Sequence, residues 1–264
     1  MKPVAYHTAL ITGASSGIGA SFARFLASRE IKVLLVARRL DRLEAIQTEI
    51  IAAGGKAEVY GADLSIEDER AALFTTISRQ HQVDILINNA GFGWYGYYHK
   101  MNWEVARRMM ATNMEAAAHL TALFLPAMLA AGRGHVINVG SIAGIFPNQG
   151  VALYSATKSF LNGFTTALHR ELRGSGVSAS VMNLGPVQTE FFEQALKIEG
   201  GRRVPAEKLA VPVERVNTAL WRLLRKPRRA VYVPRWLYFA NYVDLLFGGL
   251  VDLIGPALLR RRER

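Results

Sequence analysis

Cysteine is absent from this chain of 264 residues. Its absence excludes disulfide bonds, thiolate-bound metal ions and a cysteine nucleophile, and we expect no metal site. There is also no Ser/Gly run, no acidic block, no low-complexity tract and no internal repeat. Half of the residues are apolar, which suffices for one sizeable core. We therefore expect one domain over residues 1–234, followed by a C-terminal extension over residues 235–264.

The positive charge is distributed unevenly along the chain. The formal net charge is +11, and the segment from Arg222 to Arg264 holds ten basic residues against three acidic ones. Most of the excess charge therefore lies in the last 43 residues of the chain and needs an explanation there. At the other end, Met1–His7 is too short and polar for a secretory signal, so we expect a cytoplasmic protein.

Short apolar runs alternate with segments of helical period. The runs are apolar throughout rather than alternating with polar residues, which is typical of strands covered on both faces. Repeated β–α units of this kind predict an α/β fold, a Rossmann-type doubly wound parallel sheet of about seven strands with helices on both faces. The expected strands are Ala9–Thr12, Val33–Ala37, Ala57–Gly61, Ile85–Asn88, Val136–Val139, Val177–Asn183 and Ala230–Val233. The expected helices are Gly17–Arg29, Asp41–Ala53, Glu67–Arg79, Trp103–Leu129, Ala152–Leu172 and Val213–Leu224, with Asp41 as an N-cap.

A glycine-rich segment joins the first expected strand to the first expected helix. Glycines let the chain turn sharply, let the backbone approach a pyrophosphate and let the helix pack close to the sheet, while the helix N-terminus offers N–H groups to phosphate. The residues expected at such a site are Gly13, Ser15, Ser16, Gly17, Ile18 and Gly19. A glycine-rich turn without a ligand is the alternative, and the flanking strand and helix favour the dinucleotide site.

The second expected strand ends in Arg38 and Arg39, with no acidic residue at that position. NAD-binding enzymes usually have Asp or Glu there to accept from the ribose 2′-hydroxyl, whereas arginine accommodates a 2′-phosphate. We therefore expect NADP(H) to be preferred over NAD(H); two solvated arginines that open a helix are the alternative. Further cofactor contacts are expected after the third and fourth strands, from Asp63, Leu64, Asn89, Ala90 and Gly91. Asn88 and Asn89 are also expected to tie neighbouring strand ends by hydrogen bonds.

Three residues near the fifth strand form a candidate catalytic set. Ser141 follows that strand, and Tyr154 and Lys158 share one face of the next helix at i and i+4. A phenol has a pKa near ~10 and is a poor base at neutral pH. A neighbouring ammonium favours the phenolate and lowers that pKa, so Tyr154 could exchange a proton with a substrate oxygen held by Ser141. An ordinary exposed helix pair is the alternative.

Together these motifs resemble those of the short-chain dehydrogenase/reductase (SDR) family, in its compact single-domain form. The resemblance covers about Thr8–Val233, and it rests on the glycine segment, on N-N-A-G at Asn88–Gly91, on Asn113 and Ser141, and on Y-x-x-x-K at Tyr154–Lys158. It implies an NADP-dependent oxidoreductase that acts on a carbonyl or the corresponding alcohol, and a homodimer or homotetramer.

The resemblance also implies a role for each matching residue. Tyr154 would be the general acid/base, and Lys158 would lower its pKa and bind the nicotinamide ribose. Ser141 would polarise the carbonyl, and Asn113 would hold a water in the proton relay. Gly185, Val187 and Thr189 lie in the segment that would contact the nicotinamide carboxamide, although Leu184 stands where the family usually has proline.

Aromatic residues crowd the segment Phe92–Trp103. With Ile142–Phe146 and Glu190–Gly200, this segment is expected to border a pocket whose apolar walls suit a hydrophobic substrate, such as a lipid-like ketone, an acyl chain or a steroid. A loop packed on its own aromatics is the alternative. Glu190–Gly200 is expected to be a mobile lid over bound substrate.

The segment Trp236–Leu259 is apolar apart from Asn241, Asp244 and Asp252, and arginines bracket it. The pattern predicts a helix in a membrane interface, with its basic flanks near anionic lipid. A cover on this or a partner subunit, and a membrane span, are the alternatives. Nucleic-acid binding is not expected, because the basic residues flank an apolar segment rather than forming a stripe. In place of an enzyme, the chain could be a catalytically silent NADP-binding sensor, a membrane-associated scaffold or an oligomerisation module.

Overall fold

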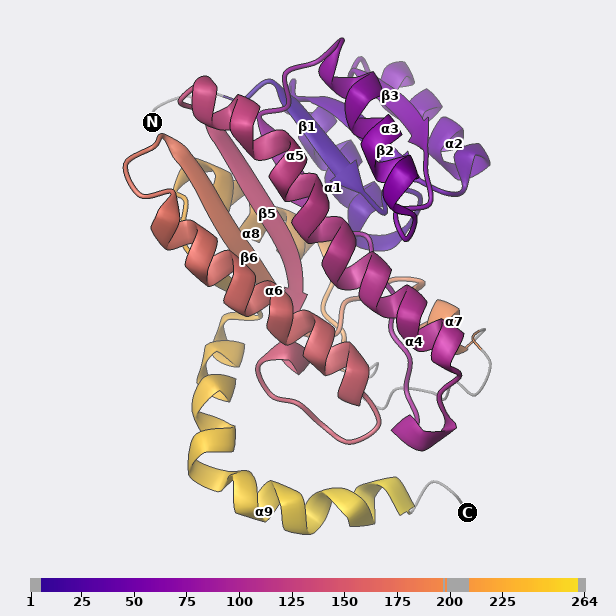
Figure 1. Ribbon diagram of the computed structural model, residues 1–264, viewed down its shortest axis with the longest axis vertical. Coiled ribbons are helices and arrows are strands. Elements are labelled where there is room, and N and C mark those ends of the chain that lie inside the picture. The colour runs from indigo at the N-terminus through magenta and orange to yellow at the C-terminus, as the bar shows by residue number, and fades with distance from the viewer. Residues whose placement is uncertain (1–5, 197, 199–208, 261–264) are drawn as a thin grey trace.

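Seven parallel strands form one sheet in the order β3-β2-β1-β4-β5-β6-β7 (Figure 1). The computed structural model describes residues 6–196, 198 and 209–260. The strands are β1 Thr8–Thr12, β2 Lys32–Ala37, β3 Ala57–Gly61, β4 Ile85–Asn88, β5 Gly134–Ser141, β6 Val177–Leu184 and β7 Ala230–Val233. All the expected strands are confirmed, and β5 extends two residues further at each end than the apolar pattern predicted.

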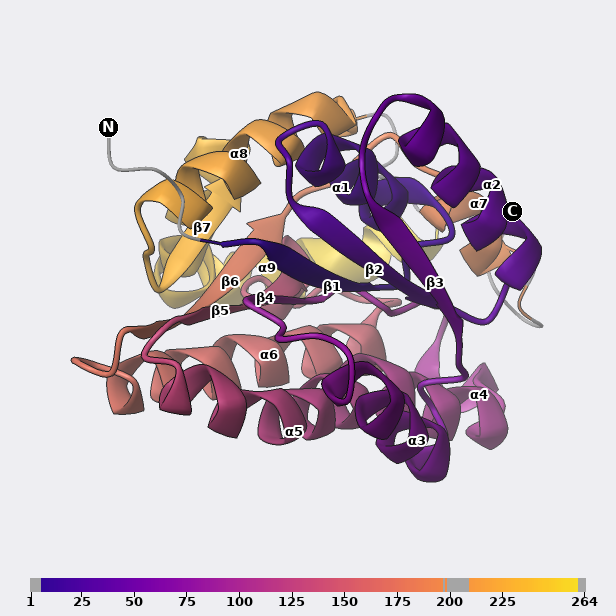
Figure 2. The ribbon, with the colours of Figure 1, turned by 90° about the horizontal axis from the view of Figure 1, so that it is seen from above.

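Helices cover both faces of the sheet, as Figure 2 shows from above. On one side lie α1, α2 and α8, and on the other α3, α5 and α6. The helices are α1 Gly17–Ala27, α2 Leu40–Ala52, α3 Glu67–Ser78, α4 Trp103–Met110, α5 Ala116–Ala130, α6 Ala152–Glu171, α7 Phe191–Leu196, α8 Val213–Arg225 and α9 Ala240–Arg260. Short turns of helix lie at η1 Tyr98–Lys100, η3 Ile142–Gly144 and η5 Arg235–Phe239.

The buried strands explain why the apolar runs do not alternate. Neighbouring residues of one strand belong to different cores: Ile11 of β1 packs with α1, α2 and α8, whereas Leu10 packs with α3, α5 and α6. Both side chains are fully buried. A strand covered on both faces needs an apolar side chain at every position, so a continuous run is the signature of this layered fold.

Two details of the sequence prediction are wrong. The expected helix Trp103–Leu129 is interrupted by a π-helical turn, η2 Ala111–Glu115, between α4 and α5. Such turns insert one extra residue into a helix and are frequent at functional sites. Asp41 is not an N-cap, because α2 begins earlier, with Arg39 at the cap and Asp41 in the first turn. There its charge still complements the positive end of the helix dipole.

The strand order reverses at β1, which lies between β2 and β4. In doubly wound sheets the chain leaves in opposite directions at this point, and the resulting crevice at the carboxyl ends of the strands binds ligands. After β7, η5 leads into α9, which crosses beneath the carboxyl ends of the strands (Figure 1). No helix in the described part of the chain has the length and apolar character needed to cross a bilayer.

Candidate active site

The glycine segment between β1 and α1 is pressed against the loop after β4. Gly13 has a φ of +64°, and a Cβ there would lie 2.9 Å from the Cα of Ala90. The Asn89 amide donates to the carbonyl of Thr12 at 2.9 Å, and the Thr12 hydroxyl accepts from the backbone N–H groups of Asn89 and Ala90. Asn88 donates to the Asn138 side chain of β5 at 2.8 Å. The predicted ties between strand ends are therefore confirmed.

Positive charge gathers beside the glycine segment. The Arg39 guanidinium donates to the hydroxyls of Ser15 and Ser16 at 3.0 and 2.7 Å. Burial, and after it the charge of Arg42, lower the pKa of Arg39. Arg38 is more exposed and lies 3.6 Å from the Asp63 carboxylate. An anion bound among these side chains would relieve the repulsion between the cations, so this corner of the site fits a phosphate group.

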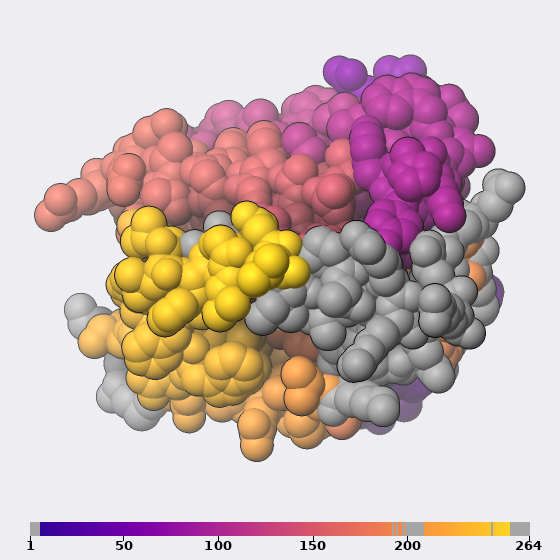
Figure 3. Space-filling model, turned by 90° about the horizontal axis from the view of Figure 1, so that it is seen from below, coloured from indigo at the N-terminus to yellow at the C-terminus, as the bar shows by residue number. Residues whose placement is uncertain are grey.

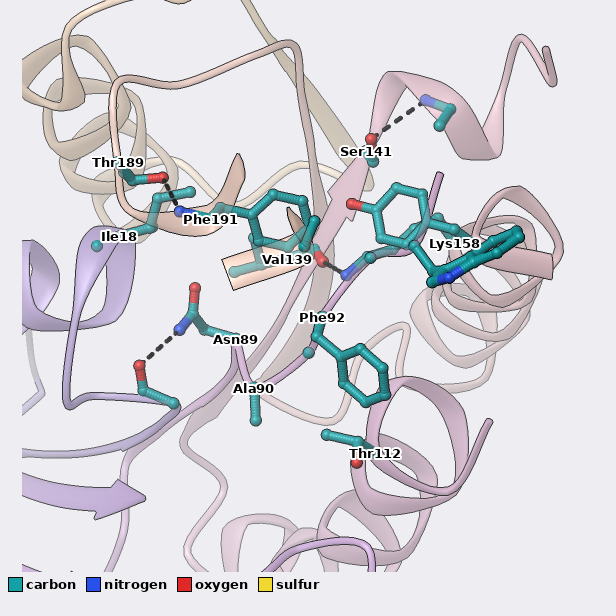
Figure 4. A pocket seen from close by; sticks show the side chains of 18 of the residues that line it. Ile18, Asn89, Ala90, Phe92, Thr112, Val139, Ser141, Lys158, Thr189 and Phe191 are labelled. Atoms are coloured by element: carbon teal, nitrogen blue, oxygen red, sulfur yellow. Dashed lines mark hydrogen bonds between the residues drawn. The ribbon is translucent and has the colours of Figure 1, made fainter. Parts of the chain in front are cut away.

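The candidate catalytic residues meet at the carboxyl end of β5. Ser141 is the last residue of that strand, and Tyr154 and Lys158 lie in the first two turns of α6. Lys158 is buried, donates to the Val139 carbonyl at 2.9 Å and lies 5.8 Å from the centre of the Tyr154 ring (Figure 4). The Ser141 hydroxyl accepts from the backbone N–H of Ala143 at 3.2 Å.

Burial controls the protonation of this set. It raises the pKa of Tyr154 to about 12, although a hydrogen bond from Ser141 lowers it in part. It lowers the pKa of Lys158 to about 8. The direction for Tyr154 is opposite to the one expected from the lysine charge alone, because removal of the phenol from water disfavours its anion. Around neutral pH the phenol therefore keeps its proton, as a proton donor must.

Asn113 lies in the π-turn and is almost fully buried. Its side chain accepts from the Phe92 N–H at 3.0 Å and donates to the Phe92 carbonyl at 3.0 Å and to the Thr157 hydroxyl at 3.1 Å. Thr157 in turn donates to the Tyr154 carbonyl. The Asn113 side chain thus joins the loop after β4 to the helix that carries Tyr154.

The segment after β6 keeps its place despite Leu184. This leucine is buried, and Gly185 donates through its backbone N–H to the Val233 carbonyl at 2.8 Å. Val187 forms a parallel bridge with Val211. A Cβ on Gly185 would lie 2.9 Å from Leu237 of η5, so the start of the C-terminal extension supports this segment from behind. No pattern in the sequence indicated the contributions of Val211 and Leu237.

Phe191, at the start of α7, lies over the catalytic end. Its ring centre is 5.9 Å from that of Tyr154, and a Cβ on Gly93 would lie 3.0 Å from its ring (Figure 4). Of the aromatic stretch Phe92–Trp103, the first part borders the cavity, whereas Tyr98 and Trp103 are exposed. The rest of the expected lid, at residues 197, 199 and 200, lies outside the described residues.

One cavity of about 840 Å³ unites both ends of the site. Every residue predicted to bind cofactor or to take part in catalysis lines it, apart from Gly19 and Asn113. Gly19 instead lies against the Gly13 carbonyl, where a Cβ would overlap the backbone. The cavity therefore joins a cradle for an anionic dinucleotide to a protonated phenol and a lysine, which is an arrangement for proton and hydride transfer.

The known proteins that resemble this chain are also dehydrogenases and reductases. The family model described as short chain dehydrogenase matches residues 7–199. The ketoacyl reductase HetN of Nostoc sp. is 36% identical over 211 residues, which cover 77% of this chain and 69% of that protein. The NADP-dependent 3-hydroxy acid dehydrogenase YdfG of Escherichia coli is 32% identical over 223 residues, with 80% and 86% covered.

A solved structure is similar over almost the whole chain. It is a short-chain dehydrogenase from Sphingobium yanoikuyae in complex with NADPH, with a TM-score of 0.80, 30% sequence identity, and 94% of this chain and 95% of that chain covered. Since the family model spans most of the sheet and the residues of its motifs meet in one cavity, this chain belongs to the short-chain dehydrogenase/reductase family.

Proposed function

We propose that this protein is an NADP(H)-dependent oxidoreductase that reduces the carbonyl group of a hydrophobic substrate, or oxidises the corresponding alcohol. The observation that carries the proposal is the cavity that is lined at one end by arginines and at the other by a half-buried, protonated Tyr154. Its size and apolar walls suit a dinucleotide together with a small apolar molecule.

The residues at the first end fit the cofactor. Gly17, the first residue of α1, would let the backbone approach a pyrophosphate at the N-terminus of that helix, and Arg39, with Ser15 and Ser16, would hold the 2′-phosphate of NADP(H). Bound NADPH supplies a hydride for the carbonyl carbon. Relatives that are named as NADP-dependent or were solved with NADPH support the same cofactor.

The proton comes from the chain itself. In the reductive direction the Tyr154 hydroxyl donates its proton to the carbonyl oxygen, and Ser141 holds that oxygen by a hydrogen bond. The ammonium group of Lys158 favours the phenolate that is left behind. Oxidation of the alcohol uses the same groups in reverse, with the phenolate as the base.

Apolar side chains near the catalytic end support a hydrophobic substrate. Ile142 and Phe146 follow β5, and Phe191 lies against Tyr154. The name of the related ketoacyl reductase is consistent with an acyl substrate. Assembly into a homodimer or homotetramer is supported by α5, which is apolar on nearly every side although one face of it is not covered by the sheet.

The test is NADPH oxidation over a panel of aliphatic, acyl and steroid ketones, with Tyr154→Phe as the control. We expect turnover of at least one apolar ketone and a loss of about 100-fold or more in kcat for the variant, with NADPH affinity retained. Binding of NADPH without turnover of any ketone would favour the catalytically silent sensor instead.

A further inference from the structure

The helix α9 turns its large apolar side chains outward. Leu246, Leu250 and Leu253, at i, i+4 and i+7, share one face of the helix and are 67%, 53% and 77% exposed. Trp236 and Phe239 of η5, the turn that leads into α9, are also exposed. We call these five side chains the apolar face.

The opposite side of α9 carries small or polar groups. Ala240, Gly248 and Val251 are less exposed than the leucines, and Asn241 donates to the Tyr232 hydroxyl of β7. A helix that covers its own subunit has its large apolar residues inward. Since α9 has the reverse orientation and makes its main contacts with η5, it does not act as a cover within this subunit. An exposed apolar surface of this size is typical of an interaction site.

The arginines near the apolar face indicate which kind of partner binds to it. Arg228, Arg229 and Arg235 precede the helix in the sequence, and a run of three arginines, at positions 260–262, begins at its last residue. Two copies of the chain paired through α9, in either direction, would place cationic ends beside cationic ends. An anionic lipid surface complements both ends at once, and exposed aromatic residues such as Trp236 are enriched where lipid meets water.

The apolar face lies at the same end of the molecule as the active site. Figure 1 shows α9 beneath the carboxyl ends of the strands, where the cavity is, and Figure 3 shows its yellow part on one side of that end of the molecule. Leu237, between Trp236 and Phe239, is buried against Gly185 of the cavity wall. A bilayer in contact with the apolar face would therefore lie close to the substrate side of the site.

We propose that the apolar face of α9 and η5 docks on an anionic membrane surface and that the enzyme takes a lipid-soluble carbonyl compound from that bilayer. The docking part stands on the exposure of the apolar face and on the arginines that flank α9 in the sequence. The delivery part rests on the proposed function, and it narrows the substrate class to amphiphiles with a long apolar chain and a carbonyl group.

Docking is tested by flotation of the full-length protein with vesicles of phosphatidylcholine, with or without phosphatidylglycerol. We expect binding to the anionic vesicles that weakens as salt is added. Each buried leucine adds about a factor of ten in partitioning, so the triple variant Leu246→Gln/Leu250→Gln/Leu253→Gln should bind at least about 100-fold more weakly. Because these side chains are exposed, the fold is expected to survive. Ile51→Gln, at an exposed apolar position on α2, is the matched control and should bind normally.

The orientation on the membrane has its own readout. Brominated lipid should quench the fluorescence of Trp236, so Trp236→Phe should remove the quenched component. Trp221 lies on α8, where its ring packs against Phe25 of α1 on one face of the sheet. Trp221→Phe should therefore leave the quenching unchanged. Absence of vesicle binding by the wild type would overturn docking. So would a triple variant that binds vesicles normally, or one that loses only self-association in sedimentation.

Delivery is tested by NADPH oxidation with a long-chain methyl ketone dissolved in the same vesicles and with a short, water-soluble ketone from the panel. The triple variant should lose about tenfold or more of its kcat/KM for the vesicle-borne ketone and keep its rate with the soluble one. Equal rates of the two proteins with both ketones would overturn delivery. Failure of the wild type to turn over any ketone would overturn the proposed function and delivery together, while flotation would still decide docking.

Discussion

Replacement of Arg39 by alanine should reduce the affinity for NADPH without a comparable effect on NADH. The guanidinium is half-buried and already makes hydrogen bonds to Ser15 and Ser16, so it is held where a 2′-phosphate would lie. Hydrogen bonds to charged groups contribute about 1.5–3 kcal/mol each. Loss of one such net contribution corresponds to a roughly 10- to 150-fold increase in the Kd for NADPH. NADH has no 2′-phosphate and should bind within about twofold of its normal Kd.

Isothermal titration of both nucleotides measures the effect, and two further variants sharpen it. Arg39→Lys keeps the charge but not the planar fork, so its loss should be intermediate. Arg38→Ala should also act selectively on NADPH but more weakly, because this side chain is more exposed and lies near Asp63. Equal losses for NADPH and NADH in Arg39→Ala would refute the assignment of this corner to the 2′-phosphate.

Three other predictions follow from charges in the structure. The kcat/KM for reduction should be level near neutral pH and fall above a pH of about 8, because Lys158 then loses the charge that favours the phenolate. A pH profile of the wild type and of Lys158→Met tests this, since the variant should not show the fall at high pH. Glu190 pairs with Arg42 at 2.8 Å and opposes anion binding near Arg39, so Glu190→Gln should tighten NADPH binding by up to about fivefold, and unchanged affinity would contradict this. Burial lowers the pKa of His135 to about 3, so the free energy of unfolding should fall by up to about 5 kcal/mol as the pH drops from about 6.5 towards 3; urea titrations should give a shallower fall for His135→Gln.

Most of the sheet could be predicted from the sequence because its strands are buried on both faces. The run Ile85–Asn88, for example, has no polar residue until its end, and that end marks the position of the site. The glycine segment and the Tyr154–Lys158 pair were predictable for a similar reason, since their spacing has a direct geometrical meaning.

Other features depend on contacts that no local pattern encodes. The residues on either side of the π-turn at Asn113 follow an ordinary helical pattern, so the sequence does not predict the turn. The hydrogen bonds of Asn113 with Phe92 and Thr157, which accompany the turn, are found only in the structure. The sequence could not distinguish Arg38 from Arg39, because the direction of each side chain is decided by the start of α2. The pKa of Tyr154 depends on burial, which the i, i+4 spacing does not report.

Leu237 packs against Gly185, and this contact divides the C-terminal extension into two parts, η5 and α9. Removal of each part should have a different consequence. A chain that ends after Phe239 retains Leu237 and should bind NADPH as the full-length protein does, while it loses α9 and with it the binding to vesicles. A chain that ends after Pro234 lacks Leu237, and this leaves a cavity behind Gly185 in the nicotinamide site. Because the residues around Gly185 would relax into that cavity, this chain should also lose nucleotide affinity, by about tenfold or more. Nucleotide titration of the two truncations would thus separate the part of the extension that belongs to the enzyme from the part that belongs to its surroundings.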